Sequence, residues 1–141
     1  MNVVVTYNSR TGNTRRAAEL IAGASTMAGA SDVVVFPVER ANEFFHELAE
    51  ADLVFVGTWT DGLILFGHRP GGTAKIKSLP KLWNKRVAAF ATYAVNPGNI
   101  SDKFAALLER HGATVTTSAA LHRRRLEDEV TDFVADSLSS I

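Results

Sequence analysis

The sequence predicts an α/β fold in which one parallel β-sheet lies between two layers of helices, as a three-layer sandwich. Five apolar runs of strand length alternate along the chain with segments of helical periodicity. These runs are apolar throughout rather than at every second residue, which is typical of parallel strands that are covered on both faces. A length of 141 residues with 46% apolar residues suits a single domain, residues 1–141, with one sizeable core.

The predicted elements form five consecutive strand and helix units. The first strand is a run of three valines, and the first helix repeats apolar residues such as Ala18 and Ile21 at helical spacing. Strands are predicted at residues 3–6, 33–36, 53–57, 87–92 and 114–121. Helices are predicted at residues 13–28, 41–49, 73–83, 101–111 and 126–138, and the third has the weakest pattern. The chain shows no internal repeat and no interdomain linker.

A polar loop joins the first strand to the first helix. Ser9, Thr11 and Thr14 supply three hydroxyls, and Gly12 permits a close backbone approach or a positive φ. Free backbone N–H groups and the positive end of the helix dipole meet at the same point. The segment has neither the Walker A pattern nor the dinucleotide fingerprint. The loop therefore predicts a phosphate site, with an ordinary helix N-cap as the structural alternative.

Two aromatic residues follow the third and fourth strands. Open α/β sheets bind ligands at the carboxyl ends of their strands, near the point where strand order reverses. Trp59 is well placed there to stack on a planar ligand, unless it only closes the edge of the core. Tyr93 is the candidate for the opposite face, and Val95 is a second candidate. In the alternative interpretation, Tyr93 is half buried beside a turn at residues 96–98.

The pattern Ser-x-Thr-Gly-x-Thr at residues 9–14 resembles the phosphate loop of flavodoxins, and the similarity extends over the whole chain. An uninterrupted last strand fits the short-chain flavodoxins. The resemblance implies a flavodoxin-like five-stranded parallel sheet of order 2-1-3-4-5 and a noncovalently bound FMN. The cofactor-binding residues that it implies are Ser9, Arg10, Thr11, Gly12, Asn13, Thr14, Thr58, Trp59, Thr60, Asp61, Gly62, Thr92, Tyr93, Ala94, Val95 and Gly98.

Two features depart from the pattern of that family. In flavodoxins a backbone peptide after the third strand reorients on reduction, and the resemblance implies the peptide between Asp61 and Gly62 for this role. Glycine tends to precede the acidic residue in the family, whereas here it follows. Flavodoxins also often carry acids around the loop after the fourth strand, and this loop is neutral.

Composition excludes several kinds of chemistry. The chain has no cysteine, which rules out disulfides, thiolate metal sites and iron–sulfur clusters. Fifteen basic and fifteen acidic residues balance, so we expect no general attraction to nucleic acid or membrane. The four histidines lack metal-ligand spacing, and we expect no metal. With no membrane-length apolar run and no recognisable signal peptide, we expect a cytoplasmic monomer.

The resemblance implies a low-potential one-electron carrier, which is an electron-transfer protein rather than an enzyme. Its partners would be a flavodoxin reductase and acceptor redox enzymes that dock transiently. One alternative is an FMN-dependent oxidoreductase that acts on a small molecule such as a quinone. A flavin-free receiver module is disfavoured, because the first strand ends without acids and Asp61 stands alone. The basic run at residues 122–125 is either a solvated connection or a docking site for an acidic partner.

Overall fold

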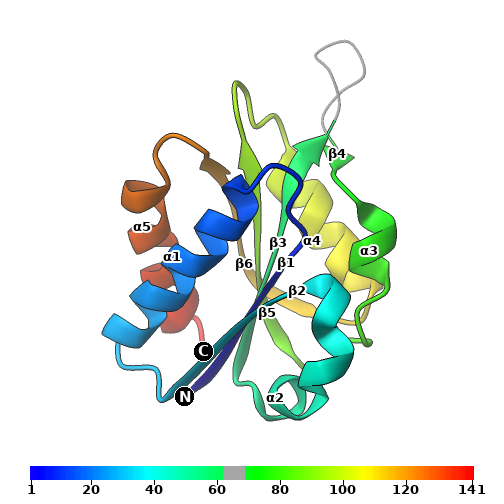
Figure 1. The fold of residues 1–141 in the computed structure, drawn as a ribbon, viewed down its shortest axis with the longest axis vertical. Helices are drawn as coiled ribbons and strands as arrows, with labels where there is room; N and C mark the ends of the chain where they lie inside the picture. Colours follow the sequence, from blue (N-terminus) through cyan, green and yellow to red (C-terminus); the bar gives the residue numbers. More distant parts are fainter. Residues whose placement is uncertain (62–68) are drawn as a thin grey trace.

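The computed structural model describes residues 1–61 and 69–141. Its parallel sheet has the order β2-β1-β3-β5-β6, and Figure 1 shows this sheet between two groups of helices. The five strands are β1 (Asn2–Tyr7), β2 (Asp32–Pro37), β3 (Leu53–Asp61), β5 (Arg86–Tyr93) and β6 (Thr114–His122). Because β5 and β6 are the fourth and fifth parallel strands, the predicted order 2-1-3-4-5 is confirmed.

A sixth strand that sequence patterns do not reveal lies at the carboxyl end of β3. This strand, β4 (Arg69–Pro70), pairs with β3 in the antiparallel direction. β3 itself runs four residues further than predicted, because Thr58 and Trp59 still pair with β5. Threonine and tryptophan favour extended backbone, which suits this continuation. Trp59 therefore lies on a strand instead of in the predicted loop.

The helices cover the two faces of the sheet in two groups. Helices α1 (Asn13–Met27) and α5 (Leu126–Ser139) lie on one face, where Ile21 and Phe133 pack against Val5. Helices α2 (Phe45–Glu50), α3 (Thr73–Lys77) and α4 (Ile100–Arg110) cover the other face. Successive residues of β1 point to opposite faces, so Val4 joins the second core and Val5 the first. Two buried faces explain why the strands are apolar throughout.

Two helices differ from the prediction. The segment predicted as one helix at residues 41–49 is a 3-10 helix, η1 (Val38–Phe44), followed by the short α2. The third helix stops at Lys77 instead of continuing to residue 83. Pro80 explains the early end, because a proline disfavours helical backbone at the residue before it, here Leu79.

Within the described residues, no helix has both the length and the apolar content needed to cross a bilayer. Gly62, which belongs to the predicted binding set, lies outside the described residues, as does His68.

Candidate functional site

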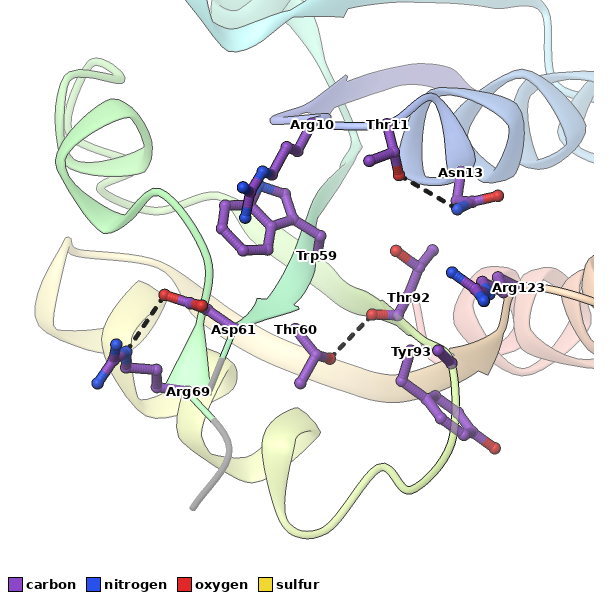
Figure 2. A pocket seen from close by; sticks show the side chains of 11 residues that line it. Arg10, Thr11, Asn13, Trp59, Thr60, Asp61, Arg69, Thr92, Tyr93 and Arg123 are labelled. Atoms are coloured by element: carbon purple, nitrogen blue, oxygen red, sulfur yellow. Dashed lines mark hydrogen bonds and ion pairs between the residues drawn. The ribbon is translucent and has the colours of Figure 1, made fainter. Parts of the chain in front are cut away.

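A cleft of about 580 Å³ opens at the carboxyl end of the sheet. Its walls come from the loop between β1 and α1, the end of β3 with β4, the end of β5, and the turn after β6. Figure 2 shows the lining side chains, which are those of Arg10, Thr11, Asn13, Trp59, Thr60, Asp61, Arg69, Thr92, Tyr93, Ala94 and Arg123. The volume lies within the range of small-molecule sites, roughly 300 to 1,000 Å³.

The loop before α1 gathers backbone donors at one point. The N–H groups of Gly12 and Arg15 both donate to the Ser9 hydroxyl, over 3.2 and 3.3 Å. Gly12 has a left-handed φ of 97°, which glycine adopts without strain and which turns the chain into the helix. The first turn of α1 holds no acidic residue, and its N-cap residue, Gly12, has no side chain that could cap it. The positive end of this helix is therefore available to an anion.

Trp59 forms one wall of the cleft between a glycine and an arginine. A Cβ atom added at Gly71 would overlap the indole ring, so the ring packs directly on the Gly71 backbone. The Arg10 guanidinium lies over the ring, with its Cζ 5.3 Å from the ring centroid, as Figure 2 shows. This distance is typical of a cation–π contact. A planar ligand that stacks on Trp59 must share the indole surface with Arg10 or displace it.

The end of β5 forms a second wall. Tyr93 is partly buried and meets the His122 ring edge-on, with ring centroids 5.1 Å apart. The Arg123 N–H donates to the Tyr93 carbonyl over 3.0 Å, which fixes the turn after β6 beside the cleft. The Thr60 hydroxyl donates to the Thr92 carbonyl over 2.8 Å and joins the two walls.

Of the sixteen residues predicted for the site, nine line the cleft, including Trp59 and Tyr93. Ser9 and Gly12 shape the loop behind it. Two hydroxyls are engaged inside the fold: that of Thr14 forms a hydrogen bond with the Thr92 hydroxyl, and that of Thr58 donates to the Gly71 carbonyl. Val95 and Gly98 lie beyond the lining residues. As cofactor ligands, all of these residues remain predictions.

Two cleft residues are not among the predicted cofactor-binding residues. Arg69 reaches the site through the antiparallel pairing of β4 with β3, and no local pattern indicated that pairing. Arg123 directly follows the last parallel strand, so the rule that ligands bind at strand carboxyl ends could have nominated it. The run at residues 122–125 was instead interpreted as a solvated connection or a docking site.

The charge of the cleft comes mainly from arginines. The described lining residues include Arg10, Arg69 and Arg123 but a single carboxylate, Asp61, whose Oδ2 lies 3.3 Å from the Arg69 Nε. Next to the loop, Arg15 pairs with Glu19 at 3.0 Å. The hydrogen bond that Arg15 donates to the Glu19 carboxylate raises the pKa of the Arg15 guanidinium above its ordinary value, so Arg15 stays charged. Within the described residues no group of histidine and acidic side chains is arranged to hold a metal ion.

Replacing Thr14 by valine is expected to lower the free energy of unfolding by about 1 to 2 kcal/mol. The Thr14 and Thr92 hydroxyl oxygens are 2.8 Å apart, and both side chains are buried. Valine keeps the shape of threonine but leaves the Thr92 hydroxyl without this partner. Urea denaturation of the ligand-free protein measures the change. Thr26→Val is the control, because Thr26 is an exposed helical threonine; equal losses in the two variants would contradict the expectation.

Comparison with known proteins gives one family match and many structural matches. The family model of the flavodoxin domain matches residues 4–121. Flavodoxin from Megasphaera elsdenii in its two-electron reduced form is 24% identical, with a TM-score of 0.72 over 97% of this chain and 98% of that one. Flavodoxin 2 from Bacillus cereus is 18% identical, with a TM-score of 0.72 over the full length of both chains.

A third structural match is to part of a larger protein. Rubredoxin oxygen:oxidoreductase from Desulfovibrio gigas is 18% identical, with a TM-score of 0.67 over 98% of this chain but only 36% of that one. At these identities the structural matches establish the fold alone. A search among curated proteins finds no match.

Proposed function

The chain belongs to the flavodoxin domain family, and from this premise we propose that it is a one-electron carrier that uses noncovalently bound FMN. A reductase would load it with electrons, and acceptor redox enzymes would unload it. FMN supplies the one-electron chemistry when it is bound. The residues described above would hold the cofactor, orient its ring and limit its access to water.

The observation that carries this proposal is the position of an anion-binding loop beside an aromatic-walled cleft. Two backbone N–H groups converge on the Ser9 hydroxyl at the start of α1, where the FMN phosphate would take their hydrogen bonds. Trp59 and Tyr93 come from neighbouring strands and line the same cleft, where they would contact the flavin ring. The chain's residues thus suit both ends of FMN.

The ionisable groups of the cleft favour a carrier. Asp61 is the one carboxylate among the described lining residues, and it forms an ion pair with Arg69. A general acid or base must be within hydrogen-bonding reach of a substrate and have a pKa near the working pH. Arginine stays protonated and does not serve this role, so Tyr93 is the other side chain of the described lining that could. A carrier needs no such group, because it only binds the cofactor and exchanges electrons.

The second candidate function is an FMN-dependent oxidoreductase. It is supported by the match to one third of the Desulfovibrio gigas oxidoreductase, in which this fold is part of a larger protein. Rapid oxidation of NAD(P)H with a quinone as acceptor, in the absence of any partner protein, would favour this candidate. Slow turnover under the same conditions, with reduction of the protein in two separate one-electron stages, would favour the carrier.

Titration with FMN and with riboflavin tests the proposal directly. We expect FMN to bind more tightly by about a hundred- to ten-thousandfold, because riboflavin lacks the phosphate and two hydrogen bonds to a charged group contribute about 1.5 to 3 kcal/mol each. Absorbance and flavin fluorescence report the binding. Equal affinities would contradict the assignment of the loop at residues 9–14 as the phosphate site. Failure to bind FMN at all would overturn the proposed function.

A further inference from the structure

Three arginines line the cleft and two more directly follow the third of them along the chain; we call these five residues the arginine rim. They are Arg10, Arg69, Arg123, Arg124 and Arg125, which come from the loop before α1, from β4 and from the turn between β6 and α5. Figure 2 shows the first three at the cleft. The last two follow Arg123 in a turn that is closed by the Arg125 N–H donating to the His122 carbonyl over 2.9 Å.

Most of the positive charge of the arginine rim is not neutralised locally. Arg69 pairs with Asp61, but the other four rim arginines have no ion pair among the described residues. The acids at the start of α5 compensate only in part. Glu127 is held by Arg16 at 2.7 Å, and the Glu129 Oε1 accepts the His122 N–H over 3.0 Å. Asp128 is the third acid in this first turn of α5.

The arginine rim makes the charge distribution of the molecule asymmetric. The chain is formally neutral, so an excess of positive charge at the cleft mouth requires an equal excess of negative charge elsewhere. A molecule with this asymmetry turns its positive end toward an acidic surface during a diffusional encounter. The end that is steered is the one that contains the candidate flavin cleft.

An exposed apolar side chain follows the Tyr93 wall of the cleft along the chain. Val95 is 86% exposed and follows Tyr93 by two residues at the end of β5. Protein interfaces commonly combine an apolar centre with a charged or polar border. Val95 and Tyr93 supply the apolar centre, and the arginine rim supplies the charged border.

We propose that the cleft mouth, with the arginine rim around it, is the docking face for a redox protein that presents an acidic patch. This inference rests on the proposed function, since docking here brings the partner to the place where electrons would leave. A bounded acidic patch fits better than nucleic acid, because the acids Glu127, Asp128 and Glu129, which follow the rim along the chain in the first turn of α5, would repel a long run of phosphates.

Equilibrium binding tests the docking face without the cofactor. The probes are native cytochrome c, whose surface is rich in lysine, and the same protein with its lysines succinylated to carboxylates. At low salt, titration calorimetry should show that the FMN-free chain prefers the succinylated probe. Binding should weaken by about tenfold in Arg124→Glu/Arg125→Glu, and it should weaken with added salt. The control Lys81→Glu/Arg86→Glu reverses two exposed charges at the other end of the sheet and should bind like the unmodified protein.

Electron transfer provides the second readout. FMN-loaded protein is reduced with dithionite and mixed with either probe, and each ferric haem then takes one electron and becomes ferrous. The rate constant for the succinylated probe should fall as salt is added, and the rate constant for the native probe should rise. Arg124→Glu/Arg125→Glu should lower the rate constant for electron transfer to the succinylated probe by about tenfold, while the control variant should leave this rate constant unchanged.

The outcomes separate the two proposals. Preference for native cytochrome c, or equal behaviour of the two double variants, would overturn the docking face and leave the carrier function intact. If the chain binds the succinylated probe but does not bind FMN, the proposed carrier function is overturned. The proposed redox role of the docking face is then overturned as well. Tight binding of a 20-base-pair DNA duplex at about 0.15 M salt, lost in Arg124→Glu/Arg125→Glu, would replace the protein partner with nucleic acid.

Discussion

Replacing Gly57 by alanine is expected to lower the free energy of unfolding by about 3 kcal/mol. Gly57 lies in the middle of β3, paired with Tyr7 of β1 on one side and Phe90 of β5 on the other. A Cβ atom at this position would overlap the Phe90 ring. The ring is fully buried and packs edge-on against Phe133, 6.2 Å away between centroids. It has no open space to move into, so the strands must separate.

The control for this substitution is Gly23→Ala. Gly23 lies on the exposed side of α1, and a Cβ atom there would meet no atom within 4 Å. Alanine is favoured over glycine inside a helix by up to about 1 kcal/mol, so this variant should be slightly more stable. Urea denaturation of both variants measures the difference. If Gly57→Ala were as stable as Gly23→Ala, the fit of Phe90 against β3 would not be as tight as described.

Sequence patterns were sufficient to locate the parallel strands because their signals are local, whereas the strand order came from the family resemblance. The buried runs of β1 and β5 begin and end within one residue of the predicted strands. The clearest misses involve contacts between distant segments. Arg69 reaches the cleft through the pairing of Thr60 with Pro70. This pairing forms the two-residue strand β4, which is too short to produce a periodic pattern in the sequence. Arg123 is placed by the register that sets Tyr93 opposite His122.

In the candidate site, too, features with local sequence signals could be predicted and contacts between distant segments could not. The loop at residues 9–14 could be recognised because its hydroxyls, glycine and helix start are contiguous. The surroundings of Trp59 could not, because Arg10 and Gly71 reach its two sides from other parts of the fold. The sequence likewise shows three adjacent arginines at residues 123–125, but not that the first of them joins Arg10 at one cleft.

Replacing Trp59 by alanine is expected to weaken FMN binding by about ten- to hundredfold. The indole ring is the largest aromatic surface in the cleft, and losing its contact with a planar ligand removes about 1.5 to 3 kcal/mol of binding free energy. The mutation should have a small effect on the phosphate loop. The N–H groups of this loop donate to Ser9, which lies in the loop and not on the strand that carries Trp59. Riboflavin binding should therefore weaken by the same factor as FMN binding.

Tryptophan fluorescence can separate this contact from a general loss of structure. The chain has two tryptophans, and Trp83 is 66% exposed beside Gly112, outside the cleft lining. Added FMN should quench the emission of Trp83→Phe, in which Trp59 is the remaining fluorophore, far more than that of Trp59→Phe. Since Arg10 covers the indole ring in the absence of ligand, Arg10→Ala should change the starting emission of Trp59 before FMN is added. Equal quenching in the two tryptophan variants would mean that the flavin does not stack on Trp59, and the cofactor would then have to be placed against Tyr93 alone.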